Sequence, residues 1–460
     1  MRFNNDIIAC LLMLGSTACS TQNYLARPLH AEQSVAAFRA RSVTTPGLKE
    51  FLLAHGQAEW PVTSWGLSEL TLLALYFSPE LRVAQAEARV AMSQAAVPRS
   101  SPSAILAPRV ERHSAGSRPW SVGIAVELPA GGGSRRGAAI EQAEFLTQAA
   151  ELNAGVTAWR IRHELRAALL ARFEAEKQSR FFADEAATQL RLMNLLERRR
   201  ELGLISAHET SAVRRRILEI EQARTSADEH ALDATHRLAA ALGLPIAVTR
   251  DLPLSFAELE HTVTSSALPA REALLNRLDI RRLLAEFASA NAAVRLEVAK
   301  QRPELTLSPG FLWDQGDSVW SLAASVLLPQ DRSAQIAEAN ARRELAAQAF
   351  LRLQQQVIHE AESSAALLRA AQQQIDNFES ALQEQQKKIA RVESQFNTGY
   401  ADRVELVNAQ VESFAAQRAL FDARVRLQKI AGVLEDSVQR PLNGFPLAPA
   451  EVFRSDLARE

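Results

Sequence analysis

The sequence predicts a mainly α-helical protein with a small β part, built from two tandem helix–hairpin–long helix–helix repeats. Three observations lead to this fold class. The stretches 134–202 and 331–398 contain no proline and almost no glycine, which predicts two very long helices. A strand-like segment at 120–129 recurs at 320–329, starting with Trp-Ser and ending with Leu-Pro. Landmarks elsewhere in the two halves are spaced in the same way, as in a duplicated chain.

The two halves align over their long helices without a gap. Trp120 and Trp320 are 200 positions apart, and beyond a glycine insertion at 131–133 the offset falls to 196. Gly203 and Gly399 share that offset, so more than sixty residues of helix keep one register. Such a match indicates an internal duplication.

Each element has a local signal in the sequence. Prolines after position 97 and at position 303 end the first helix of each copy, because proline cannot continue a helix. Gly203 and Gly399 end the long helices and separate them from the shorter helices that follow. The expected helices are 67–97, 134–202, 207–242, 270–301, 331–398 and 402–436, with hairpins at about 104–128 and 304–328. The expected organisation is a signal peptide (1–18), an N-terminal extension (19–64), a first repeat (65–243), an irregular equatorial connector (244–268), a second repeat (269–436) and a C-terminal tail (437–460).

Composition excludes several classes of protein. The 460 residues carry 52 Lys+Arg against 53 Asp+Glu, so there is no basic excess for nucleic acid. A charged fraction of 23% is too high for a bundle of membrane-spanning helices. In the second long helix, apolar residues recur in steps of three, four and seven, which is typical of an ordinary coiled coil.

The N-terminus resembles an export signal. An apolar run at 7–15 is too short to span a bilayer and is followed by small residues and Cys19. A cysteine in that position predicts a bacterial lipoprotein with an acylated Cys19, and plain signal peptidase cleavage nearby is the alternative. The other cysteine, Cys10, lies inside the signal, so the mature chain is expected to have no disulfide.

The strands alternate between apolar and small or polar residues. Nine to eleven residues with this pattern suit a strand that crosses a membrane, with Trp120 and Trp320 near an interface. A half-buried hairpin of a soluble sheet has the same alternation. Four strands cannot close a barrel, and open edges are not tolerated in lipid, so several chains would have to pool their strands. The segment 104–113 alternates poorly and is the weakest strand.

The layout as a whole resembles the TolC-like family of outer membrane efflux proteins, over about 67–434. The resemblance rests on the segments 78–82 and 277–281 early in each first helix, on Pro303-Glu304-Leu305, on the strand-ending Leu-Pro pairs, and on the turns at 203–206 and 399–402. The short hairpins and the run from Glu127 to Arg136 resemble most the heavy-metal (cobalt-zinc-cadmium) branch, whereas Leu278 departs from the proline expected there.

The resemblance implies a homotrimer in the outer membrane, extending into the periplasm. Twelve pooled strands would form one β-barrel, and the helices would continue it as an α-helical barrel. The resemblance further implies that the helix–helix turns dock a periplasmic adaptor (membrane fusion) protein linked to an inner-membrane pump. It implies docking tips at Gly203, Leu204, Ser206, Gly399, Tyr400 and Ala401, a periplasmic gate at Asp402, Arg403, Glu405 and Glu209, and a lumen residue at Glu127.

We therefore expect a passive exit duct of a tripartite efflux system, for metal ions or small toxic molecules. The alternatives are a conduit for type I protein secretion and a periplasmic coiled-coil adaptor or structural protein. No catalytic, metal or cofactor site is expected. The Gly131–Ser134 run lacks the lysine of a phosphate loop, and His208-Glu209 and His359-Glu360 lack the second histidine of a zinc helix. The charged tip residues also fit plain helix starts, where acidic groups favour the dipole.

Overall fold

The computed structural model describes residues 24–56, 60–100, 103–114, 119–260, 277–328 and 330–442. The chain divides into two units, Met1–Arg41 and Ser42–Glu460. The described part of the first unit contains one helix, α2 (Ala31–Arg39). All the other described elements belong to the second unit. The predicted signal peptide and Cys19 lie outside the described residues.

The second unit contains the same run of elements twice, in the order that the sequence predicts. The first run is α5 (Pro79–Ala96), β1 (Ile105–Arg112), β2 (Trp120–Pro129), α6 (Gly133–Glu201) and α7 (Ala207–Leu242). The second run is α11 (Leu278–Ala299), β3 (Glu304–Asp314), β4 (Asp317–Leu327), α12 (Ser333–Asn397) and α13 (Arg403–Val438). The fold class is therefore confirmed at the level of a mainly helical chain with one small sheet.

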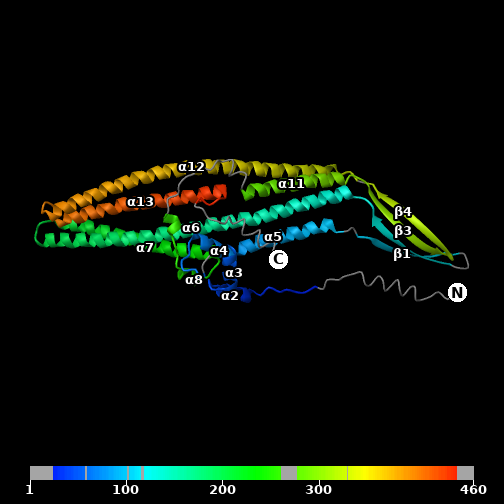
Figure 1. Cartoon of the computed structure of the whole chain (residues 1–460), viewed down its shortest axis with the longest axis horizontal. Helices are drawn as coiled ribbons and strands as arrows, with labels where there is room; N and C mark the ends of the chain where they lie inside the picture. Colours follow the sequence, from blue (N-terminus) through cyan, green and yellow to red (C-terminus); the bar gives the residue numbers. More distant parts are fainter. Residues whose placement is uncertain are drawn as a thin grey trace. The chain divides into compact units, whose positions relative to one another are not determined.

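The two long helices organise the helical part. With 69 and 65 residues, α6 and α12 are each about 100 Å long at 1.5 Å per residue. Near the strands, α6 packs on α5 and α11, and α11 packs on α12; towards the other end, α6 packs on α7 and α13, and α13 packs on α12. Four helices therefore pack side by side near the strands and four towards the other end, and α6 and α12 belong to both sets (Figure 1). None of the helices in the described ranges has an apolar run long enough to cross a membrane.

The largest apolar core lies at mid-length of α6. There α3 (Pro46–Ala54), α4 (Leu67–Phe77), the end of α7 and the short helix α9 (Ala257–Glu260) contribute side chains to one cluster. Its centre includes the fully buried Leu70, Leu73, Leu165 and Leu169. Burying a leucine contributes about 1.5–3 kcal/mol, so this cluster holds the segments before and after the first repeat against its middle.

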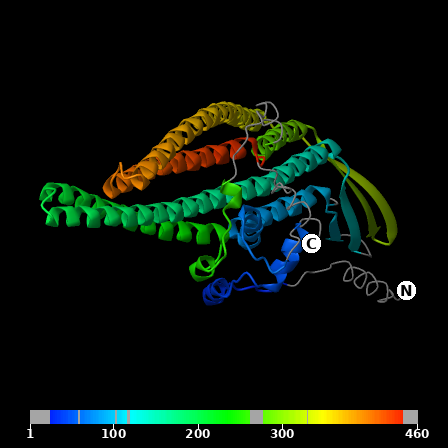
Figure 2. The same ribbon diagram turned by 60° about the vertical axis from the view of Figure 1, so that its left-hand side comes forward.

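The four strands form one antiparallel sheet in the order β1-β2-β3-β4. The two hairpins meet where β2 pairs with β3, so the sheet joins the two repeats; Figure 2 shows it beyond one end of α6. Gln315 and Gly316 turn the second hairpin with positive φ angles of 51° and 116°, as a two-residue turn of the I′ kind requires. The poorly alternating segment at 104–113 does form a strand, because β2 pairs with it along its whole length.

Several expectations differ from the structure. The helix expected at 67–97 is two helices, because Ser78 has an extended backbone, caps α5 by accepting a hydrogen bond from Leu81 N (3.2 Å), and precedes Pro79. The connector, which was expected to be irregular, contains α8 (Ile246–Arg250) and α9. The N-terminal extension contains α2 and α3. The first helix of the second repeat was expected to begin at about residue 270. Residues 261–276 lie outside the described residues, and α11 begins at Leu278.

Candidate functional site

The sheet has one apolar face, and that face is open. Residues that are paired across adjacent strands lie on the same face of the sheet, so Ile124 lies beside Phe311, and Phe311 lies beside Trp320. Trp120 is 55% exposed, Trp320 80% and Leu322 73%, so large apolar side chains cover a surface rather than a core. The other face carries small and polar residues, among them Gly123, Ala125, Glu127, Gly310, Ser321, Ala323 and Ser325. An exposed apolar face of this extent marks contact with lipid or with another protein.

The sheet also has two open edges in the part of the chain that the structure describes. No described strand pairs with the outer side of β1 or of β4, and β4 is exposed along all of its 11 residues. Unpaired edge groups pair readily with another strand, and in lipid they must do so, because no water satisfies them. The predicted lumen residue Glu127 is half-buried on the small-residue face.

The first predicted tip is a tight turn that depends on glycine. Gly203 has φ +71°, and Leu204 N donates to Arg199 O over 2.9 Å, which closes the end of α6. Leu204 is 70% exposed at the turn. Ser206 then begins α7 in a capping box: Ser206 N donates to Glu209 Oε1 at 3.3 Å. Glu209, a predicted gate residue, therefore has a local capping role here.

The second tip repeats this turn. Gly399 has φ +80°, and both Tyr400 N and Ala401 N donate to Gln395 O, at 2.8 and 3.2 Å. Tyr400 is 88% exposed, with its ring outside the helices. A Cβ added at either glycine would meet nothing within 4 Å, so only the backbone angle requires glycine at these turns.

The predicted gate residue Asp402 bridges the two tips. Its Oδ2 lies 2.5 Å from Arg199 Nη2 at the end of α6, and its Oδ1 accepts Glu405 N at 3.0 Å as the cap of α13. The hydrogen bond from Arg199 is the main cause that lowers the pKa of Asp402 below its ordinary value. Arg199 is not among the gate residues predicted from the sequence. The run Arg198-Arg199-Arg200 just before Gly203 was the available signal.

Apolar contacts reinforce the tip. Leu192 and Leu196 of α6 are buried against Val407 of α13, and Ile205 packs on the same cluster. The first and second repeats are therefore held together at the tip by one ion pair and one apolar cluster. The predicted gate residues Arg403 and Glu405 are exposed on the first turn of α13.

A buried polar network joins the repeats at mid-length. Arg162 Nη1 lies 2.9 Å from Glu435 Oε2, and Arg166 donates to Gln428 O at 2.7 Å and to Gln428 Oε1 at 2.9 Å. These side chains are nearly inaccessible, and burial lowers the pKa of Arg166 below its ordinary value. Gly432 makes room for it, since a Cβ there would lie 2.3 Å from Arg166 Nη1. Sequence patterns held no signal for this network.

Serine, histidine and aspartate meet in the sheet, but not as a nucleophilic triad. His113 Nε2 lies 2.8 Å from Ser121 Oγ and 3.3 Å from Asp314 Oδ1, while Ser121 Oγ donates to Asp314. A catalytic aspartate binds the other ring nitrogen and leaves the serine free to attack. Ser121 is fully buried, so the trio fastens the first hairpin to the second. Within the described ranges, no three His, Cys, Asp or Glu residues are grouped as metal ligands.

Solved structures share this arrangement. The outer membrane protein VceC from Vibrio cholerae is 20% identical, with a TM-score of 0.67 over 82% of this chain and 97% of that one. The outer-membrane channel OprN is 18% identical, with a TM-score of 0.66 over 81% and 89%. The Campylobacter jejuni CmeC outer membrane channel is 13% identical, with a TM-score of 0.66 over 95% and 97%.

The chain has the fold of these outer-membrane channels. No protein-family model and no curated protein matches the sequence. At 13–20% identity the likeness establishes the channel fold and not the cargo. The mainly helical single-chain fold with a small sheet that the TolC-like resemblance implied is therefore confirmed. The trimer, the twelve-stranded barrel and the heavy-metal branch stay predictions.

Proposed function

We propose that this chain is the outer-membrane exit duct of a tripartite efflux system. The observation that carries the proposal is the open four-stranded sheet: an exposed apolar face and two unpaired edges, continuous with helices of about 100 Å. Edges of this kind are satisfied in lipid only by closure into a barrel. Three copies would supply twelve strands, and the channel fold of the similar structures supports that assembly.

The same arrangement gives the tips their proposed role. The two turns lie at the far ends of α6 and α12 from the strands, where exposed Leu204 and Tyr400 offer apolar contacts to a periplasmic adaptor. The Arg199–Asp402 pair and the neighbouring Arg403 and Glu405 would act as the gate at the closed end of the duct. The cargo would be metal ions or small toxic molecules delivered by an inner-membrane pump.

The experiment is fractionation of cells that express the full chain, followed by mass measurement of the protein in mild detergent. We expect the protein in the outer membrane as a trimer, and a soluble monomer would refute the proposal. A deletion strain should become sensitive to metal ions, drugs or detergents. Loss of a secreted protein with unchanged sensitivities would favour the protein-secretion alternative.

A further inference from the structure

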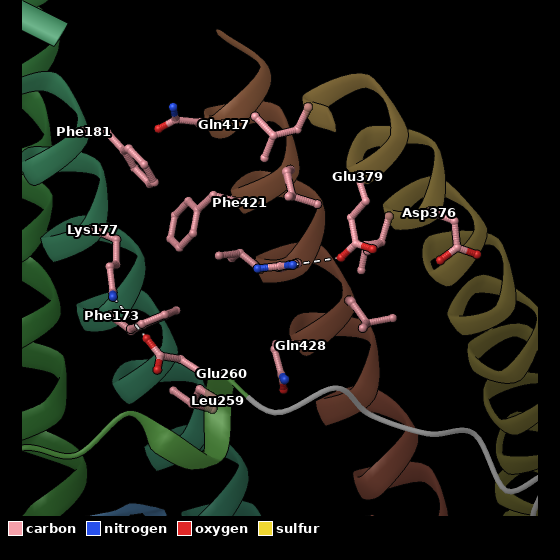
Figure 3. A pocket seen from close by; sticks show the side chains of 16 residues that line it. Phe173, Lys177, Phe181, Leu259, Glu260, Asp376, Glu379, Gln417, Phe421 and Gln428 are labelled. Atoms are coloured by element: carbon pink, nitrogen blue, oxygen red, sulfur yellow. Dashed lines mark hydrogen bonds and ion pairs between the residues drawn. The ribbon is translucent and has the colours of Figure 1, made fainter. Parts of the chain in front are cut away.

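A groove on the helical wall has the chemistry of a ligand site. Its volume is about 650 Å³, within the range of small-molecule pockets. The floor is formed by α13, the two sides are α6 and α12, and α9 lies at one end (Figure 3). Along α6 and α13 the groove lies between the buried network at Arg162 and the cluster at the tip.

One side of the groove is aromatic. Phe421 of α13 lies between Phe173 and Phe181 of α6, with ring centroids 5.8 and 5.4 Å apart (Figure 3). Lys177 Nζ lies 5.5 Å from the centroid of the Phe173 ring and 3.1 Å from Glu260 Oε1. The groove therefore already holds one ammonium group between an aromatic face and a carboxylate, an arrangement that favours cations.

The groove lining contains one more carboxylate than cationic groups. The lining contains three carboxylates and two cations: Glu260 pairs with Lys177, and Glu379 Oε1 lies 2.8 Å from Arg424 Nη2. Asp376, the third carboxylate, has no ion-pair partner among the described side chains. An apolar aromatic wall with one negative charge to spare is complementary to a hydrophobic cation.

We propose that this groove binds a hydrophobic organic monocation, with its apolar body against Phe181 and Phe421 and its charge favoured by the net negative charge of the lining, to which Asp376 contributes. Such a ligand contacts α6 of the first repeat and α12 and α13 of the second. It therefore stabilises the arrangement in which these helices now lie, because binding to one state favours that state. Binding at this groove goes beyond the proposed export role and does not depend on it.

The test uses full-chain protein in detergent and the probe tetraphenylphosphonium, with tetraphenylborate as an anion of the same shape. Equilibrium dialysis should show saturable binding of the cation and none of the anion. Asp376→Asn should weaken cation binding about two- to fivefold, the effect of an exposed charge pair. The matched control, Glu393→Gln, removes one charge from the same helix about 25 Å away and should leave binding unchanged.

A second pair of variants tests the aromatic wall. Phe181→Leu keeps an apolar side chain but removes the ring, and should weaken binding about two- to fivefold. Its neighbour Phe182 contacts Arg418 outside the groove lining, so Phe182→Leu is the control. Equal binding of tetraphenylborate, or Asp376→Asn and Phe181→Leu variants that both bind like their controls, would overturn the proposal. Asp376 is exposed, so its variant should fold even where a ring variant does not.

Discussion

Arg162 of α6 and Glu435 of α13 form an ion pair with both side chains 5% exposed, and Glu435 Oε1 also accepts Leu442 N at 3.0 Å. One carboxylate thus serves two buried arginines, since Arg166 Nε lies 3.6 Å from the same oxygen as Arg162. A buried pair of this kind contributes little by forming, but removing one partner is costly, because the other charge stays buried and alone.

Glu435→Ala should therefore lower the free energy of unfolding by about 3–5 kcal/mol. The measurement is chemical denaturation of the detergent-solubilised protein. Glu412→Ala is the matched control: Glu412 pairs with Lys388 on the surface, so its loss should change the free energy of unfolding by about 1 kcal/mol or less. Similar losses in the two variants would mean that the network at Arg162 does not join the repeats.

Gly432 should not tolerate a methyl group. In Gly432→Ala the new Cβ would overlap Arg166 Nη1, whose bonds to Gln428 hold it in place, so the free energy of unfolding should fall by about 1–3 kcal/mol. Gly137, also in a helix, has nothing within 4 Å of a Cβ, and Gly137→Ala should raise stability by up to about 1 kcal/mol. Opposite signs in one denaturation series are the expected result, and equal signs would contradict the role of Gly432.

Asp436 should make stability depend on pH. Burial is the main cause that raises its pKa above the ordinary value, against the lowering effects of His163 and Arg277 and with the raising effects of Glu360 and Asp279. Because the folded pKa exceeds the unfolded one, the stabilising contribution is complete below about pH 3.9 and is lost as the pH rises through the folded pKa.

Asp436→Asn, which imitates the neutral acid, should accordingly stabilise the protein at pH 7 and have a smaller effect near pH 4. The measurement is the difference in free energy of unfolding between variant and parent at several pH values. A destabilised variant at pH 7 would show that the electrostatic attraction of His163 and Arg277 outweighs burial at Asp436.

The tip glycines should be required for export but not for assembly. Replacing Gly203 or Gly399 with valine imposes positive φ on a β-branched residue, which costs about 1–2 kcal/mol and should distort the turn. Asparagine accepts this conformation, so Gly203→Asn and Gly399→Asn are the controls. We expect trimers from all variants in mild detergent and loss of resistance only with valine. Unchanged resistance with valine at both turns would reject a docking role for the tips.

The two faces of β4 should respond differently to charge. Leu322 lies on the apolar face and Ala323, one residue on, on the small-residue face. Leu322→Arg should impair assembly in the outer membrane, since an arginine facing lipid near the midplane costs about 2–4 kcal/mol. Ala323→Arg should assemble normally. The amount of trimer in outer-membrane fractions measures both, and the reverse ranking would mean that the proposed lipid and lumen faces are exchanged.

Local patterns explain why much of the fold could be predicted. The order of helices and hairpins, the breaks at Gly203 and Gly399, and the alternation in the strands all depend on residues within a few positions of one another. The break at Ser78 was missed because apolar periodicity continues across it. The strand at 105–112 alternates poorly and forms because β2 pairs with it, so its own sequence is a weak guide.

The sequence by itself determined the duplication, the long helices, the glycine turns and the two unlike faces of the strands, since each follows from local periodicity and backbone preference. Only the tertiary structure decided which residues meet across the repeats. Arg199 with Asp402, Arg162 with Glu435, and the groove between Phe181 and Asp376 join positions about 200 or more apart. Charge pairs of this kind leave no period in a sequence, because their partners are chosen by packing and not by spacing along the chain.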